Sequence, residues 1–175
     1  MRNTIKKGLL GAAVLATMGI SAHGVYAATA NLSTDAVIIT PIAVAVTRNL
    51  DFGEISVGAT GGDFIIDSSG ASGTTIDPDV ASVGGTVQSG RVDVTGDTTR
   101  SFQVSVPASL LIVSGGDNMT VDDFTIEGGA AGAAYTSNLV AGSETDIDIG
   151  GTLAVGASQN PGTYTANLVV TADYN

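Results

Sequence analysis

Short runs of alternating apolar and polar residues, separated by glycine pairs, recur along most of this sequence. A period of two is typical of strands with one buried face, and glycine pairs are typical of the turns between strands. Strong helix formers are scarce, and no segment sustains a 3.6-residue period. The pattern therefore predicts an all-β protein, an antiparallel β-sandwich. The expected strands are residues 50–55, 63–67, 91–95, 101–106, 119–127, 145–149 and 163–174. The expected separators are Gly61-Gly62, Gly84-Gly85, Gly115-Gly116, Gly128-Gly129 and Gly150-Gly151.

The first 27 residues differ in character from the rest. Arg2, Lys6 and Lys7 precede an apolar stretch over residues 8–20, and Ala27 ends a short segment of small residues. These features are typical of a secretory signal peptide and predict cleavage after Ala27. We therefore expect residues 1–27 to be a signal peptide, and the mature protein to be exported.

The residues that follow position 27 lack several reactive types. The chain has no cysteine, its one histidine is His23, and every lysine precedes position 27. Ser-His-Asp and Cys-His catalysis, lysine Schiff bases and zinc sites built on imidazole or thiolate are thereby excluded. The same part holds all 17 acidic residues against Arg48, Arg91 and Arg100. This negative charge disfavours nucleic acid as a partner.

Carboxylates remain as candidate functional groups. Asp146 and Asp148 begin like an EF-hand loop, but Ala157 stands at the twelfth position, where calcium needs a glutamate. We expect both aspartates to point to solvent from a strand whose Ile147 and Ile149 face inward. Candidates for glycoside hydrolysis are Glu54, Glu127, Glu144 and the pair Asp122 and Asp123. No tryptophan is present to stack on a sugar, and acidic residues on a solvated β surface explain the pattern. We expect no catalytic residue, no metal, no cofactor and no small-molecule substrate, and we expect Phe52, Phe64, Phe102 and Phe124 to be core residues.

The alternation near the N-terminus extends too far for one strand. Even positions from Ala30 to Val46 are nearly all apolar, which at about 3.3 Å per residue gives roughly 56 Å. A domain of this size is only about 40 Å across, and Pro41 lacks the amide that a central strand needs. We therefore expect an extension over residues 28–39 and a domain over residues 40–175, whose first strand begins near Ile42. The alternative is a frayed terminus before an ordinary strand.

The end of the sequence has a specific pattern. Residues 160–162 place proline and glycine where a type II turn needs them, and an alternating segment follows. Its apolar face is expected to hold Tyr164, Ala166, Leu168, Val170, Ala172 and Tyr174. With Gly162 fourteenth from the end and Tyr174 penultimate, the segment resembles the last strand of chaperone–usher pilin subunits.

Two motifs strengthen this resemblance. Residues 50–53, LDFG, are similar to the LNFG-type motif of the archaic branch of these pilins. Together with residues 160–165, NPGTYT, they resemble an uncharacterised family of secreted Gly/Thr-rich bacterial proteins that look pilin-like. The interior, residues 58–158, resembles these proteins only in its general sequence pattern and not in a specific motif. Many pilins also carry a disulfide near the first strand, which this chain cannot form.

The resemblance implies an incomplete immunoglobulin-like sandwich that polymerises by donor-strand exchange. It would be exported through the periplasm and become a subunit of an extracellular fimbria or pilus on a Gram-negative cell surface, with a role in cell adhesion. The implied partners are copies of itself or related pilin subunits, a periplasmic chaperone and an outer-membrane usher. The strand that binds chaperone and subunit would contain Gly162 and the apolar face from Tyr164 to Tyr174. The donor strand would insert Ala30, Leu32, Ala36 and Ile38. The alternative is a self-contained secreted β-sandwich adhesin or surface-layer module that does not polymerise.

Overall fold

The computed structural model describes residues 27–69, 74–75, 77–126, 135–138 and 145–175. The expected signal peptide, except Ala27, and the glycine pair Gly128-Gly129 lie outside these residues. By its contacts the chain divides into Met1–Val37 and Ile38–Asn175. In the first unit, residues 27–37 contain no strand and are exposed. The second unit holds all the described strands, and no helix in the described ranges is long and apolar enough to span a membrane.

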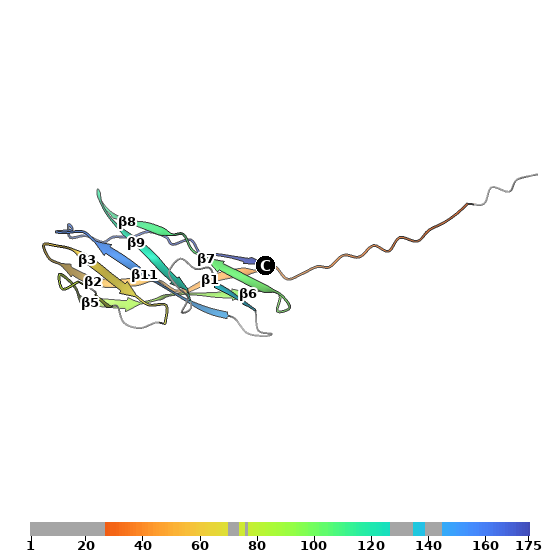
Figure 1. The fold of residues 1–175 in the computed structure, drawn as a ribbon, viewed down its shortest axis with the longest axis horizontal. Coiled ribbons are helices and arrows are strands. Elements are labelled where there is room, and N and C mark those ends of the chain that lie inside the picture. The colour runs from red at the N-terminus through yellow and green to blue at the C-terminus, as the bar shows by residue number, and fades with distance from the viewer. Residues whose placement is uncertain (1–26, 70–73, 76, 127–134, 139–144) are drawn as a thin grey trace, which may run out of the picture. The chain divides into compact units, whose positions relative to one another are not determined.

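The protein is all-β with a sandwich-like arrangement, which confirms the predicted fold class (Figure 1). Its strands are β1 (Ala43–Arg48), β2 (Asp51–Val57), β3 (Gly62–Ile66), β4 (Thr74–Thr75), β5 (Val80–Gln88), β6 (Gly90–Thr95), β7 (Ser101–Ser105), β8 (Ser109–Ser114), β9 (Asp117–Ile126), β10 (Tyr135–Asn138), β11 (Thr145–Val155) and β12 (Thr171–Tyr174).

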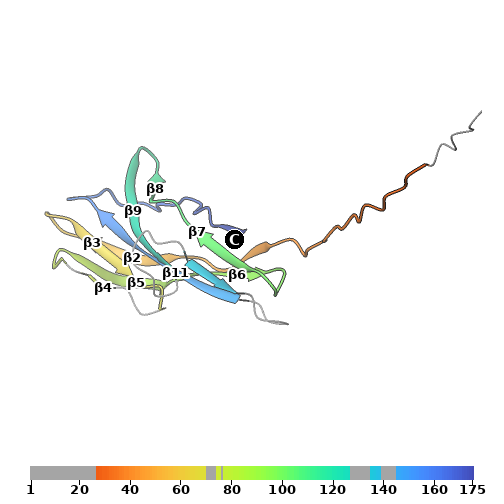
Figure 2. The same cartoon turned by 45° about the vertical axis from the view of Figure 1, so that its right-hand side comes forward.

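The strands form three antiparallel groups. The largest has the order β1-β6-β11-β3-β4. β6 and β3 pair with successive parts of one edge of β11, β9 pairs with its opposite edge, and β8 pairs with β9. A second group has the order β10-β7-β12, and β2 pairs with β5 in a third. The two views in Figures 1 and 2 show β11 as the long central strand between β6, β3 and β9.

The hydrophobic core collects the inward faces of these strands. Phe64, Phe102 and Phe124 are at most 1% exposed, as expected, and Phe52 packs against the core with its ring 6.3 Å from that of Phe64. Alternation places the inward residues correctly in β6 and β7, because each of these strands has one buried face. In β9 the alternation is broken at Asp123, which has a φ of 44°, so that Val121, Phe124 and Ile126 are the buried residues. Ile147 and Ile149 of β11 are also buried, as predicted.

Two glycine pairs lie inside strands, contrary to the prediction that they separate strands. β11 continues through Gly150 and Gly151, where its pairing with β9 shifts register. A Cβ on Gly150 would overlap the carbonyl oxygen of Ile66 and lie 2.6 Å from the amide nitrogen of Ser68. Gly84 and Gly85 lie within β5. Gly150 therefore permits close backbone approach rather than a turn, and a Cβ on Gly85 would also lie 3.0 Å from the amide nitrogen of Glu54.

The expected strand over residues 163–174 is much shorter in the structure. Only Thr171–Tyr174 forms a ladder, with β7, and Thr165 forms one isolated bridge to Val113 of β8. The strand prediction is wrong over residues 163–170, because apart from the bridge at Thr165 this segment has no ladder with a neighbouring strand. The first domain strand begins at Ala43, close to the predicted Ile42.

Candidate functional site

An apolar groove runs between β2 and the C-terminal segment, by which we mean residues 163–170. One side is formed by residues 46 and 48–57, and the other by residues 159–168 and 170. Its volume of about 1160 Å³ exceeds the roughly 300–1,000 Å³ of small-molecule pockets. Core-facing side chains of β8, β9 and β11 line the base: Leu110, Ile112, Met119, Val121, Ile149, Leu153 and Val155.

The main chain on both sides of the groove has unused pairing capacity. β2 pairs only with β5, so its second edge has no partner strand in the described part of the chain. In the C-terminal segment, Thr165 and Val113 exchange two main-chain hydrogen bonds of 3.1 and 3.2 Å. Residues 166–170 form no main-chain hydrogen bond to any other described residue. Each side can therefore accept hydrogen bonds from, and donate them to, an added strand.

Side chains near the groove are apolar yet incompletely covered. Val44 and Val46 of β1 are register partners of Val94 and Val92, and paired residues in an antiparallel ladder point to the same face. Val92 and Val94 are at most 2% exposed, whereas Val44 is 37% and Val46 is 66% exposed. The core face of β1 is thus open, and Val46 itself lines the groove.

The NPGTYT motif fixes one end of the C-terminal segment. The Tyr164 hydroxyl donates to the carbonyl oxygen of Asn160 (2.7 Å) and accepts from Nε2 of Gln159 (2.9 Å). Nδ2 of Asn160 donates to Asp117 (3.0 Å), at the turn between β8 and β9. A Cβ on Gly162 would overlap Oγ of Ser114, so a larger residue there would require the Ser114 side chain to move. Gly162 does not have the positive φ that the expected type II turn requires, and its role is close approach instead.

The LDFG motif shapes the opposite side. Gly53 has a φ of 71°, its amide donates to the side chain of Asp51 (2.9 Å), and the β2–β5 register shifts at this point. A Cβ on Gly53 would lie 2.9 Å from the carbonyl oxygen of Gly84. This bulge bends β2 along the groove and lets Phe52 pack against Phe64.

The structure places the sequence-predicted partner-binding residues along the C-terminal segment and β12. Gly162, Tyr164, Ala166, Leu168 and Val170 all line the groove. Leu168, Val170, Ala172 and Tyr174 are half-buried and pack against the core, whereas Ala166 is exposed. Of the predicted donor residues, Ala30, Leu32, Ala36 and Ile38 are all exposed, with Leu32 at 92% and Ile38 at 96%.

Several groove residues were missed by sequence reasoning. Val46 and β2 were not predicted to face the groove, nor were Leu110 and Ile112 of β8 or Met119 of β9. The apolar run over residues 110–113 is a signal that could have indicated β8. Residues of β8 and β2 line the same groove, and this proximity is visible only in the tertiary fold.

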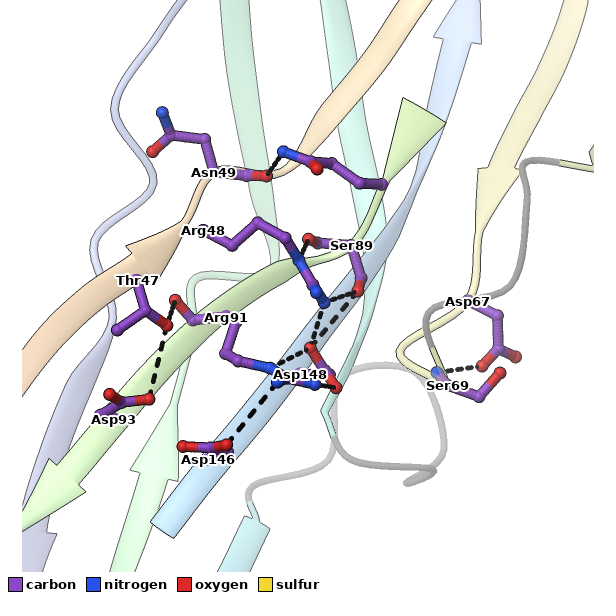
Figure 3. Close-up of polar contacts among 11 residues, drawn as sticks. Thr47, Arg48, Asn49, Asp67, Ser69, Ser89, Arg91, Asp93, Asp146 and Asp148 are labelled. Atoms are coloured by element: carbon purple, nitrogen blue, oxygen red, sulfur yellow. Dashed lines mark hydrogen bonds and ion pairs between the residues drawn. The ribbon is translucent and has the colours of Figure 1, made fainter. Parts of the chain in front are cut away.

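A charged network ties together β1, β6 and β11 (Figure 3). Asp148 receives two hydrogen bonds from Arg91, at 2.7 and 3.0 Å, and one from Arg48 at 2.5 Å. Arg48 also donates to Oγ and the carbonyl oxygen of buried Ser89, both at 2.7 Å. Asp148 was expected to point to solvent, but its side chain is only 14% exposed, because the two arginines cover it.

The two aspartates of this network titrate differently. The hydrogen bonds from Arg91 hold the pKa of Asp148 below its ordinary value, with the charges of Arg91 and Arg48 adding to the effect. Asp146 is 56% exposed, as predicted, and the hydrogen bond it shares with Asp93 raises its pKa. No group of three potential metal ligands is found within the described ranges. The hydrogen bonds of Asp148 to Arg48 and Arg91 connect β11 to β1 and β6.

The other acidic candidates are scattered. Glu54 is exposed on β2, and Glu127 and Glu144 lie outside the described residues. Burial raises the pKa of Asp122, with the charges of Asp123 and Asp63 adding to the effect. Glu54 lines the groove, whereas Asp122 and Asp123 are not among the groove residues.

The fold and site define an all-β, sandwich-like protein with a strand-sized apolar groove. The chain belongs to the family described as Domain of unknown function (DUF4402), which matches residues 42–174. This range begins just before β1 and includes both sides of the groove. No curated protein and no solved structure matches the chain significantly.

Proposed function

We propose that the protein is a secreted structural subunit of a surface fimbria, assembled by donor-strand complementation. The groove between β2 and the C-terminal segment carries this proposal. It combines an apolar base with two unpaired main-chain edges, which is the arrangement that β-strand addition uses. The resemblance of residues 50–53 and 160–174 to pilin motifs supports the same mechanism.

In this proposal the domain is an immunoglobulin-like sandwich that lacks one strand. A strand added between β2 and the C-terminal segment would pair with both edges and cover the open faces of Val46 and Leu168. The added main chain would set the register, and every second side chain would enter the groove. The domain alone leaves this surface uncovered, as the 66% exposure of Val46 indicates.

Residues 28–39 of a second copy are the proposed donor strand. At about 3.3 Å per residue, these residues extend over about 40 Å, as do residues 163–174 beside the groove. Their alternation brings Ala30, Leu32, Ala36 and Ile38 to one face. The exposure of Leu32 and Ile38 in the free chain means that insertion would remove large apolar side chains from water.

The open groove also explains why holding partners are expected. Unpaired edges beside apolar side chains favour aggregation. A periplasmic chaperone would cover the groove until an outer-membrane usher passes the subunit to the next copy. In this proposal the protein acts at the cell surface, is not an enzyme and requires no cofactor.

A binding experiment tests the proposal directly. A labelled peptide of residues 28–39 is added to the domain that lacks these residues, and fluorescence anisotropy is recorded. The matched control peptide carries Leu32→Asp and Ile38→Asp, which place charges where apolar contacts are expected. We expect saturable binding of the first peptide only. Equal binding of both peptides, or of neither, would favour a self-contained adhesin or surface-layer module.

A further inference from the structure

The hydroxyl group of Tyr174 connects two segments that are distant in sequence. It donates a hydrogen bond to the carbonyl oxygen of Thr40 (2.8 Å) and accepts one from the amide of Asp97 (2.5 Å). The side chain is half-buried and packs against the core. The hydroxyl is therefore held where β12, the turn after β6 and the chain leading into β1 meet.

The groups that hold this hydroxyl are themselves fixed. The side chain of Asp97 accepts hydrogen bonds from the amide (2.9 Å) and hydroxyl (2.6 Å) of Thr99. Tyr174 is the register partner of Phe102 in β7, and the amide of Asn175 donates to the carbonyl oxygen of Ser101 (3.1 Å). The turn at Asp97 and the end of β12 are thus both held in place by hydrogen bonds.

The segment that accepts the hydrogen bond has little backbone freedom of its own. Thr40 precedes Pro41, which restricts Thr40 to extended conformations and fixes φ of Pro41 near −65°. Ile42 then packs against the core. Upstream of this point, Ile38 is almost fully exposed, and residues 27–42 belong to no strand.

We infer that Tyr174 is a positioning residue for the extension over residues 28–39. Its hydroxyl fixes the carbonyl group of Thr40, the residue that directly follows the extension. The use of the extension as a donor strand rests on the proposed function, whereas the hydrogen bonds do not. A donor strand with an ordered base loses less conformational entropy on entering a neighbour's groove. The resemblance to pilins implies a partner-binding role for Tyr174, and its hydroxyl also has a role within its own subunit.

Tyr174→Phe tests the inference because it removes the hydroxyl and retains the ring. Tyr164→Phe is the matched control, since it also removes a half-buried, hydrogen-bonded hydroxyl. The chain has no cysteine, so Val37→Cys provides one attachment point for a nitroxide label in the mature protein. We expect Tyr174→Phe to sharpen the electron paramagnetic resonance spectrum of the label, and Tyr164→Phe to leave it unchanged. Hydrogen exchange should show loss of protection at the Asp97 amide in Tyr174→Phe only.

Identical label spectra with and without the Tyr174 hydroxyl would overturn the inference. A second measurement needs no variant, because the Asp97 amide of the unsubstituted protein must be protected against exchange. If that amide exchanges as fast as a free peptide, the inference is wrong even where Tyr174→Phe fails to fold. Both measurements use the monomer. A chain that never accepts a donor peptide would refute the proposed function and leave these results intact.

Discussion

Val46 and Val92 are register partners on one face of the β1–β6 ladder, yet Val92 is 2% exposed and Val46 is 66% exposed. Their side chains have the same orientation, so the difference places the edge of the core at β1, the end strand of the largest sheet.

Alanine substitution at these two positions should therefore have different effects. Val92→Ala should lower the free energy of unfolding by about 2 kcal/mol, because it leaves a cavity in the core. Val46→Ala should change it by less than about 0.5 kcal/mol. If a donor strand covers Val46, however, Val46→Ala should weaken binding of the peptide of residues 28–39 about fivefold. Urea unfolding and fluorescence anisotropy provide the two readouts, and an unchanged affinity would mean that the added strand does not reach β1.

Neighbouring residues of the C-terminal segment offer a second matched comparison. Leu168 faces the groove and packs against the core, whereas Val169 is 68% exposed. Leu168→Asp should abolish peptide binding and cost about 2 kcal/mol of stability, because a charge enters an apolar contact. Val170→Asp should behave in the same way. Val169→Asp should have little effect on either quantity, and loss of binding in this variant would show that the other face is the binding face.

The Arg48–Asp148–Arg91 network predicts a specific pH dependence. The pKa of Asp148 is held below its ordinary value of 3.8, so its stabilisation is complete above pH 3.8 and is lost as the pH falls through the lowered pKa. Asp148→Asn should cost about 2 kcal/mol at pH 7, between the values for exposed and buried ion pairs. The difference from the unsubstituted protein should shrink as the pH is lowered below 3.8.

Asp146→Asn is the control for this network. The pKa of Asp146 is raised by its hydrogen bond with Asp93, so its ionisation at neutral pH opposes folding rather than favouring it. Its removal should leave stability at pH 7 unchanged or slightly higher. Equal losses in both variants, measured by denaturant unfolding from pH 3 to pH 7, would contradict this assignment of roles.

Two glycines of similar appearance in the sequence should respond differently to alanine. At Gly150 the added Cβ would meet the backbone of Ile66 and Ser68, whereas at Gly116 no atom lies within 4 Å. Gly150→Ala should therefore cost about 3 kcal/mol or more, because neither strand can move without breaking the ladder. Gly116→Ala should be nearly neutral. Thermal unfolding distinguishes the two, and a stable Gly150→Ala variant would show that β11 can shift past β3.

Part of the fold follows from the sequence alone. Alternation correctly predicts β2, β3, β6, β7 and β9, because each has one face towards the core. It fails where glycines serve close packing, as at Gly150, because a glycine pair looks the same in a turn and in a crowded strand. It also misses β5 and β8. β5 has mostly exposed residues, and β8 presents its apolar residues as one continuous run.

The candidate site was predictable on one side only. The apolar face from Tyr164 to Tyr174 has a period of two and could be recognised along the chain. The opposite side, β2, and the base, including Ile112 and Leu153, come from segments that are distant in sequence. Their meeting depends on the pairing of β11 with β3 and β9, which no local pattern encodes.

The most direct test of the account is to let the chain fill its own groove. Residues 28–39 are deleted from the N-terminus and joined behind Asn175 through a short Gly/Ser linker. A short flexible linker gives a local concentration in about the millimolar range, so insertion within the chain should outcompete insertion between chains. Melting temperature and size-exclusion volume are compared with those of the deletion variant alone. We expect the rejoined chain to be a monomer with a markedly higher melting temperature. A deletion variant that is equally stable and equally monomeric would mean that the sandwich is already complete, which contradicts the donor-strand account.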